Sequence, residues 1–275
     1  MTMPKNLLDD DEYLDVIERE TRRFRECLVG AEAGARVPSC PDWTADDLVW
    51  HLGGEVQDFW AWVISHRPDV PNDYDEPQRP EGRHALLEVL DRSHEHLMNQ
   101  LRNADPRDGA WSWAGDSSLH TVGFTVRRQA HEALIHRVDA ELTVGERTPI
   151  NPRLATDGAL ECLEWMYGNL PAWARFEPDG SRAIIEMTDT GHRVLVGLGR
   201  IIGDHPRTGE HVDQQELQVL ERSVHEPVEA DATIAGTGED LDLWLWHRGP
   251  ANLLQMTGDE GVLDRVMAVL GESID

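Results

Sequence analysis

The sequence lacks the features that mark membrane-spanning, secreted and disulfide-stabilised proteins. No apolar run approaches the roughly 18–20 residues that cross a bilayer. The N-terminal stretch has no basic segment followed by an apolar core, which argues against a signal peptide. The cysteines Cys27, Cys40 and Cys162 are odd in number and form no C-x-x-C pair, so no disulfide framework is expected. We therefore expect a cytoplasmic protein in which any metal site is built from histidine and carboxylate.

Positive charge is also scarce. The 25 lysines and arginines face 52 aspartates and glutamates, which gives a formal net charge of -27, and Lys5 is the only lysine. A field of this sign repels phosphate backbones and anionic membranes, so neither nucleic acid nor a membrane is an expected partner. The acidic excess favours solubility and attracts cations.

The first half of the chain has the apolar spacing of long helices. A length of 275 residues favours two domains over one. The spacing predicts helices over 10–33, 45–65, 82–103 and 120–143, with Thr44 as the N-cap of the second and a turn-forming break just before it. Because the connections between the later helices are long, we predict a four-helix bundle with crossovers over residues 1–150.

The second half changes character and predicts a smaller α+β domain over residues 151–275. A further helix is expected near 153–170. Short strands are expected at 182–190, 191–200, 216–223 and 230–237, followed by helices at 239–248 and 261–271. We predict an antiparallel sheet here, and the whole chain belongs to the α+β class.

Three side chains of the predicted bundle have the pattern of a metal site. Glu132 and His136 are four residues apart, which puts them on one helix face about 5–6 Å apart at Cβ. His51 lies on the expected inward stripe of the second helix. That stripe comprises Leu48, His51, Leu52, Glu55, Phe59, Trp62 and Val63. Bundles build metal sites from facing helices in this way, and two histidines with one glutamate suit Zn²⁺ or Fe²⁺ with one position open.

Other interpretations of these residues stay open. A Glu/His pair at this spacing is often an exposed hydrogen bond, and a single histidine such as His51 is often only packed in a core. Glu55 would be a fourth ligand or, more simply, a carboxylate that supports His51. His131-Glu132 begins like the H-E-x-x-H zinc motif, but Ile135 stands where the second histidine is required, so a metalloprotease is excluded.

Three stretches together resemble one family. They are P-S-C-P-D-W-T-A-D-D-L-V-W-H-L-G-G, A-H-E-A-L-I-H-R-V-D-A-E and the segment 232–259 around L-D-L-W-L-W-H-R. The chain resembles the mycothiol-dependent maleylpyruvate isomerase family of the DinB-like superfamily, whose second domain is similar to sterol-carrier-like folds. That resemblance implies a divalent metal, most often zinc, held by His51, Glu132 and His136. It also implies a role for Arg248. Val138 is a departure, since the family often carries tryptophan there.

The resemblance further implies the reaction. Mycothiol would be the thiol cosubstrate, and a small-molecule electrophile would be isomerised or would receive the thiol. Two alternatives remain open: a metal-stabilised binding or regulatory module without chemistry, and a metal-dependent hydrolase that uses the same three ligands. A monomer or a small homo-oligomer is expected.

Overall fold

The computed structural model describes residues 6–32 and 34–272 and divides the chain into two compact units. One unit comprises Leu8–Trp113 and Ser118–Thr148. Among the described residues, the other comprises Ala114–Ser117, 149–272 and the stretch 6–7. The first is helical and the second holds a sheet, which confirms the α+β class. The division into one domain over residues 1–150 and a second over residues 151–275 stays a prediction.

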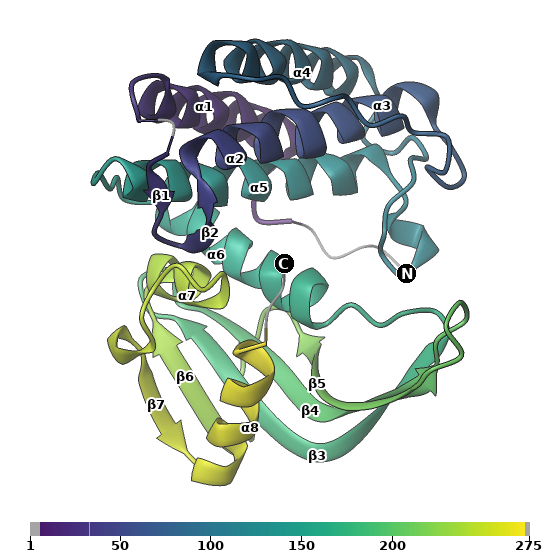
Figure 1. Ribbon diagram of the computed structural model, residues 1–275. Helices are drawn as coiled ribbons and strands as arrows, with labels where there is room; N and C mark the ends of the chain where they lie inside the picture. The colour runs from purple at the N-terminus through teal and green to yellow at the C-terminus, as the bar shows by residue number, and fades with distance from the viewer. Residues whose placement is uncertain (1–5, 33, 273–275) are drawn as a thin grey trace. The chain divides into compact units, whose positions relative to one another are not determined.

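Four helical rods form the core of the first unit, called the bundle unit below (Figure 1). Three rods are single helices, α1 (Asp10–Val29), α4 (Arg83–Asn103) and α5 (Val122–Thr143). The remaining rod consists of α2 (Ala45–Trp50), the π-helical segment η1 (His51–Gln57) and α3 (Asp58–His66), end to end. α1 packs along α5, and α3 packs along α4. No helix in the described part of the chain is both long and apolar enough to cross a membrane.

Local hydrogen bonds explain where the second rod begins. The Thr44 hydroxyl accepts the backbone N–H of Asp47, and the Asp47 carboxylate accepts the backbone N–H of Thr44 at 2.8 Å. This reciprocal capping box confirms Thr44 as the predicted N-cap. The segment before it is more ordered than the expected break, because β1 (Arg36–Val37) and β2 (Cys40–Thr44) pair as a short antiparallel hairpin.

The π-helical segment changes which side chains face the core. Its backbone hydrogen bonds reach one residue further than those of an α-helix, so the following side chains are rotated from their α-helical positions. Gln57 and Trp60 are therefore buried. The prediction that Glu55, Phe59 and Trp62 line the inward stripe was wrong, because Glu55 is exposed and the two rings are only half-buried.

The second unit, called the sheet unit below, contains a five-stranded sheet in the order β5-β4-β3-β6-β7. The strands are β3 (Ala174–Met187), β4 (His192–Asp204), β5 (His211–Glu221), β6 (Ala232–Gly236) and β7 (Gln255–Gly258). All neighbours pair antiparallel except β3 with β6, which are parallel. The mainly antiparallel sheet confirms the expectation, whereas the parallel pair and strand β7 were not predicted.

Helices and a π-helical segment accompany this sheet, besides a short 3-10 turn, Ala251–Leu253. They are α6 (Pro152–Glu161), the π-helical segment η3 (Cys162–Tyr167), α7 (Gly238–Leu245) and α8 (Glu260–Leu270). α6 packs on α7, while α8 contacts several strands of the sheet (Figure 1). The predicted helix over 153–170 thus ends earlier, and its last turns are π-helical.

A buried charge network joins α1 to α5. Arg137 donates through Nε to Glu20 Oε2 at 2.7 Å and through Nη1 to Glu141 Oε2 at 2.9 Å. Arg23 and the backbone N–H of Thr148 also donate to Glu141. Burial by itself raises the pKa of Glu141, but these donors outweigh it and lower the pKa to about 2. The carboxylate is therefore ionised and fully paired.

We expect the change Arg137→Ala to lower the free energy of unfolding by about 3–5 kcal/mol, because it leaves Glu20 and Glu141 charged, buried and short of a partner. Urea unfolding followed by circular dichroism measures the change. The exposed Arg22 of α1 provides the control, and Arg22→Ala should stay within about 0.5 kcal/mol of the parent. Equal effects of the two changes would contradict this account of the network.

Candidate metal centre

Three side chains from two rods of the bundle unit converge on one point. Glu132 Oε1 lies 3.1 Å from His136 Nε2 and 3.7 Å from His51 Nε2. One donor atom of each residue lies within 4.8 Å of the other two. The structure thus brings together the three residues that the sequence indicated as ligands.

The local backbone explains how each side chain reaches this point. Glu132 and His136 lie one helical turn apart on α5, so their side chains are neighbours. His51 is the first residue of η1, and Gly53 follows two residues later. A Cβ atom at Gly53 would come within 2.8 Å of the Leu90 Cα on α4. The missing side chain therefore lets the rod that bears His51 pack closely against its neighbour.

Carboxylates hold both imidazole rings by their outer nitrogens. Glu55 Oε2 lies 2.8 Å from His51 Nδ1, and Asp139 Oδ2 lies 2.9 Å from His136 Nδ1. Each contact favours a proton on Nδ1 and directs Nε2 toward Glu132. Histidines that bind metals are commonly held by a carboxylate in this way. Glu55 thus occupies the supporting position that was the simpler expectation for it.

The hairpin β1–β2 contributes two more side chains to the site. The ring of Trp43 packs against both imidazoles, with centroids 4.7 Å from His51 and 6.3 Å from His136. The hydroxyl of Ser39 donates to Oδ1 of Asp139, a fully buried residue whose Oδ2 contacts His136. The hairpin therefore fixes the rings and the carboxylate that orients one of them.

Opposite charges face one another inside the cluster. Arg128 Nη2 donates to Glu132 Oε2 at 3.1 Å, which leaves Oε1 directed at the two histidines. Burial opposes ionisation of Glu132, but His136, His51 and Arg128 outweigh it and hold the pKa of this carboxyl well below its ordinary value. Burial likewise opposes protonation of His136, yet Asp139 and Glu132 raise its pKa to about 9. When no metal ion is bound, the protonated ring of His136 is attracted to the carboxylates of Asp139 and Glu132, and this attraction stabilises the cluster.

The donor set fits a divalent cation in place of that proton. Ligand distances of about 2.0–2.2 Å in a tetrahedral zinc site keep neighbouring donors roughly 3.3 Å apart, close to the separations around Glu132 Oε1. The side chains of His51 and Glu132 are 24% and 19% exposed, so the cluster is not sealed. Three protein donors with an accessible side are typical of a catalytic rather than a structural site.

Other residues considered from the sequence lie elsewhere. His131 is buried, with its ring 6.1 Å from that of Tyr13 on α1. Arg248 belongs to the sheet unit, just after α7, where Nη1 donates to the carbonyl oxygen of Trp246 at 2.6 Å.

Sequence reasoning missed Asp139, Ser39 and Trp43. Asp139 was recognisable, since it lies three residues after His136 and therefore on a neighbouring part of the same helix face. Nothing local indicates Ser39 or Trp43, because their contacts with α5 exist only after the hairpin has packed on the bundle.

Comparison with protein families finds two matches that together span most of the chain. Residues 14–141 match the mycothiol maleylpyruvate isomerase N-terminal domain, and residues 153–265 match the C-terminal domain of the same family. Comparison with curated protein sequences found no relative.

Two solved structures share the fold. One is a crystal structure of the mycothiol-dependent maleylpyruvate isomerase, with a TM-score of 0.56 at 13% identity. The other is a histidine-to-alanine mutant of that isomerase, with a TM-score of 0.54 at 12% identity. In both comparisons the match covers 93% of this chain and 97% of the other.

The raised pKa of His136 predicts a pH dependence for the metal-free protein. A histidine whose folded pKa lies above its unfolded value of about 6.5 stabilises the fold fully below that value and loses the effect as pH rises through the folded pKa. We expect His136 to contribute up to about 3 kcal/mol at pH 6 and little above its folded pKa of about 9. Urea unfolding at both ends of this range measures the loss.

An NMR titration separates His136 from the other histidines, with His136→Gln identifying its signal. The variant Asp139→Asn weakens the hydrogen bond that is the largest single cause of the raised pKa, so the titration midpoint of His136 should fall in this variant. A midpoint for His136 at or below 6.5 in the parent would contradict the geometry described for the cluster.

Proposed function

The chain belongs to the mycothiol maleylpyruvate isomerase family, and we propose that it is a metal-dependent enzyme that uses mycothiol as its thiol. The observation that carries this proposal is the convergence of His51, Glu132 and His136 on one point. The solved structures that share the fold are named for mycothiol-dependent isomerisation, which supports the choice of thiol. The proposed reaction is isomerisation of an activated double bond or transfer of the thiol to an electrophile.

His51, Glu132 and His136 are the proposed ligands, and Zn²⁺ is the proposed ion, since two histidines and a glutamate are a known catalytic zinc set. When bound, such an ion lowers the pKa of a thiol at its open position, so that a thiolate is available at neutral pH. The chain's own residues orient this chemistry. Glu55 and Asp139 hold the outer nitrogens of the rings, while Arg128 holds the second oxygen of Glu132.

The proposed reaction begins with addition of the thiol to the electrophile and differs between the two outcomes only in its last step. The thiolate sulfur adds to a carbon–carbon double bond conjugated with a carbonyl, which forms a C–S bond and an enolate. Rotation about the new single bond, followed by expulsion of the thiolate, returns the double bond in the trans form. In thiol transfer, the enolate carbon instead takes a proton and the C–S bond remains.

Arg248 is the proposed catalytic residue of the sheet unit. It is half-buried, and its guanidinium already donates to a backbone carbonyl. A guanidinium carries five donors in a planar fork that matches a carboxylate or an enolate oxygen. We propose that Arg248 binds such an oxygen of the substrate or of the thiol.

We expect the purified protein to contain stoichiometric zinc and the variants His51→Ala and Glu132→Ala to contain only traces, because each loses one of three proposed ligands. Elemental analysis by plasma mass spectrometry measures this. The exposed His84 of α4 offers a matched control, and His84→Ala should keep the metal. Full metal content in both ligand variants would refute the site, and iron in place of zinc would correct the ion.

Turnover should require the thiol. In assays of maleylpyruvate and a panel of other electrophiles, we expect product only when mycothiol is present, and only with the metal-loaded protein. The variant Arg248→Ala should lower kcat/KM by about 100-fold or more, since loss of one donor to a developing oxyanion costs about that much. Ultraviolet absorbance follows the isomerisation, and mass spectrometry detects thiol adducts.

The same assay separates the alternative functions. Turnover without any thiol would indicate a hydrolase that uses the three ligands, and metal binding without turnover of any thiol–electrophile pair would indicate a binding module. Arg248→Lys retains the charge but not the planar fork, so an activity equal to that of the parent would contradict the role proposed for Arg248.

A further inference from the structure

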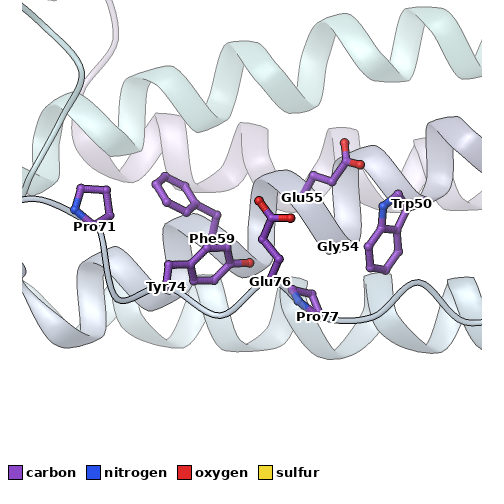
Figure 2. A pocket seen from close by; sticks show the side chains of 8 residues that line it. All are labelled: Trp50, Gly54, Glu55, Phe59, Pro71, Tyr74, Glu76 and Pro77. Atoms are coloured by element: carbon purple, nitrogen blue, oxygen red, sulfur yellow. The ribbon is translucent and has the colours of Figure 1, made fainter. Parts of the chain in front are cut away.

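A hollow of about 410 Å³ lies beside the candidate metal centre in the bundle unit (Figure 2). The second rod forms one side of it and the loop between α3 and α4 forms the other. Three aromatic residues, Trp50, Phe59 and Tyr74, line it together with two acidic residues, Glu55 and Glu76. A hollow of this size lies within the usual range of roughly 300–1,000 Å³ for small-molecule pockets.

The aromatic walls are held in place by packing. Figure 2 shows the rings of Phe59 and Tyr74 on one side of the glutamates and Trp50 on the other. The rings of Phe59 and Tyr74 meet edge to face, with centroids 5.1 Å apart. A Cβ atom at Gly54 would come within 2.4 Å of the Trp50 ring, so this ring lies directly over the glycine. The walls are therefore preformed, with ring surfaces available to a ligand.

The charged residues that line the hollow, Glu55 and Glu76, are both acidic. Among the described residues that line it, none is basic. The Tyr74 hydroxyl donates to Asp58 Oδ2 at 3.0 Å. Burial and the negative charges of Asp58 and Glu76 raise the pKa of Tyr74 above its ordinary value, as expected in a negative local potential. Within the described lining, no lysine or arginine side chain neutralises the carboxylates of Glu55 and Glu76.

An organic cation matches both properties of the hollow. An ammonium group bound to carbon is attracted to the faces of aromatic rings and to carboxylates. A carboxylate ligand is repelled by the same glutamates. A neutral ligand of equal shape would gain the apolar contact but not the electrostatic attraction. The set of three rings and two carboxylates thus selects for positive charge.

Glu55 connects this hollow to the candidate metal centre. Its Oε2 contacts His51 Nδ1 at 2.8 Å, while its side chain also lines the hollow. Half of the Glu55 side chain is exposed, so the carboxylate is accessible to a ligand as well as to the ring. A cation bound here would lie one side chain away from His51.

We propose that this hollow binds an organic ammonium group and that the electrophile used at the metal centre carries one. The second part rests on the proposed function, whereas the first concerns binding alone. The hollow then acts as a recognition site for the charged end of the electrophile, next to the carboxylate that holds His51. It also disfavours a dicarboxylate as the occupant of this part of the site.

Three isosteric probes test the binding in the full-length, metal-loaded protein. They are choline, its neutral isostere 3,3-dimethylbutan-1-ol, and the anion 3,3-dimethylbutanoate. We expect choline to bind about tenfold more tightly than the neutral alcohol, and the anion more weakly than either. Titration calorimetry gives the affinities, and quenching of tryptophan fluorescence reports on the wall that contains Trp50.

Variants of the loop supply the controls. Glu76→Gln should weaken choline binding about fivefold and leave the alcohol unchanged, because it removes one charge without altering shape. Asp75 is exposed and does not line the hollow, so Asp75→Asn should keep the affinity of choline within about twofold of the parent. Equal affinity for choline and the alcohol, or a preference for the anion, would overturn the cation site.

A matched pair of thiol acceptors tests the second part. One is an acrylamide that carries a trimethylammonium group, and the other carries a tert-butyl group at the same place. We expect a lower KM for the charged acceptor with mycothiol, and Glu76→Gln should remove the difference. An unchanged ratio would overturn the substrate assignment. The choline titrations contain neither thiol nor electrophile, so they test the cation site independently of the proposed reaction. A failure of choline to bind would leave thiol-dependent turnover unaffected, and a lack of turnover would leave the choline result unaffected.

Discussion

The candidate site depends on one contact, in which a single oxygen of Glu132 faces imidazole nitrogens from two different helical rods. Such a cluster is unfavourable to bury unless a proton or a cation lies among its donors. Its surroundings are arranged to maintain that geometry. Carboxylates hold the outer nitrogens of both rings, Arg128 holds the remaining oxygen of Glu132, and Trp43 packs on both rings. The contact explains why these otherwise separate polar and aromatic groups are found together.

The π-helical segment η1 serves two neighbouring features at once. It begins at His51, and its wider turn directs Gln57 and Trp60 into the core while Phe59 stays near the surface. Phe59 is then available to the wall of the acidic, aromatic hollow. Glu55, within the same segment, reaches both the hollow and His51. Segments of this kind are frequent at functional sites, because one additional residue per turn re-aims side chains without ending the helix.

The family fold leaves much of the specificity undecided. Identities of 12–13% to the solved isomerase structures accompany coverage of nearly the whole chain, so the architecture is shared while most side chains differ. Function is carried by the site and its immediate surroundings rather than by the fold. The described lining of the hollow has acidic but no basic side chains, and these side chains are the ones on which the proposed selection among electrophiles depends.

Features that depend on neighbours along the chain were determined by the sequence itself. The helical rods, the cap at Thr44 and the pairing of Glu132 with His136 follow from spacing and capping, because hydrogen bonds one turn apart involve only local residues. The inward stripe of the second rod also indicated His51 as the partner of that pair, and the structure places it there. The tertiary structure alone decided that Trp43 and Ser39 support the pair and that β6 joins β3 in parallel. These contacts join residues far apart in the sequence. They form only when side chains of several elements pack together, and no local pattern encodes that packing.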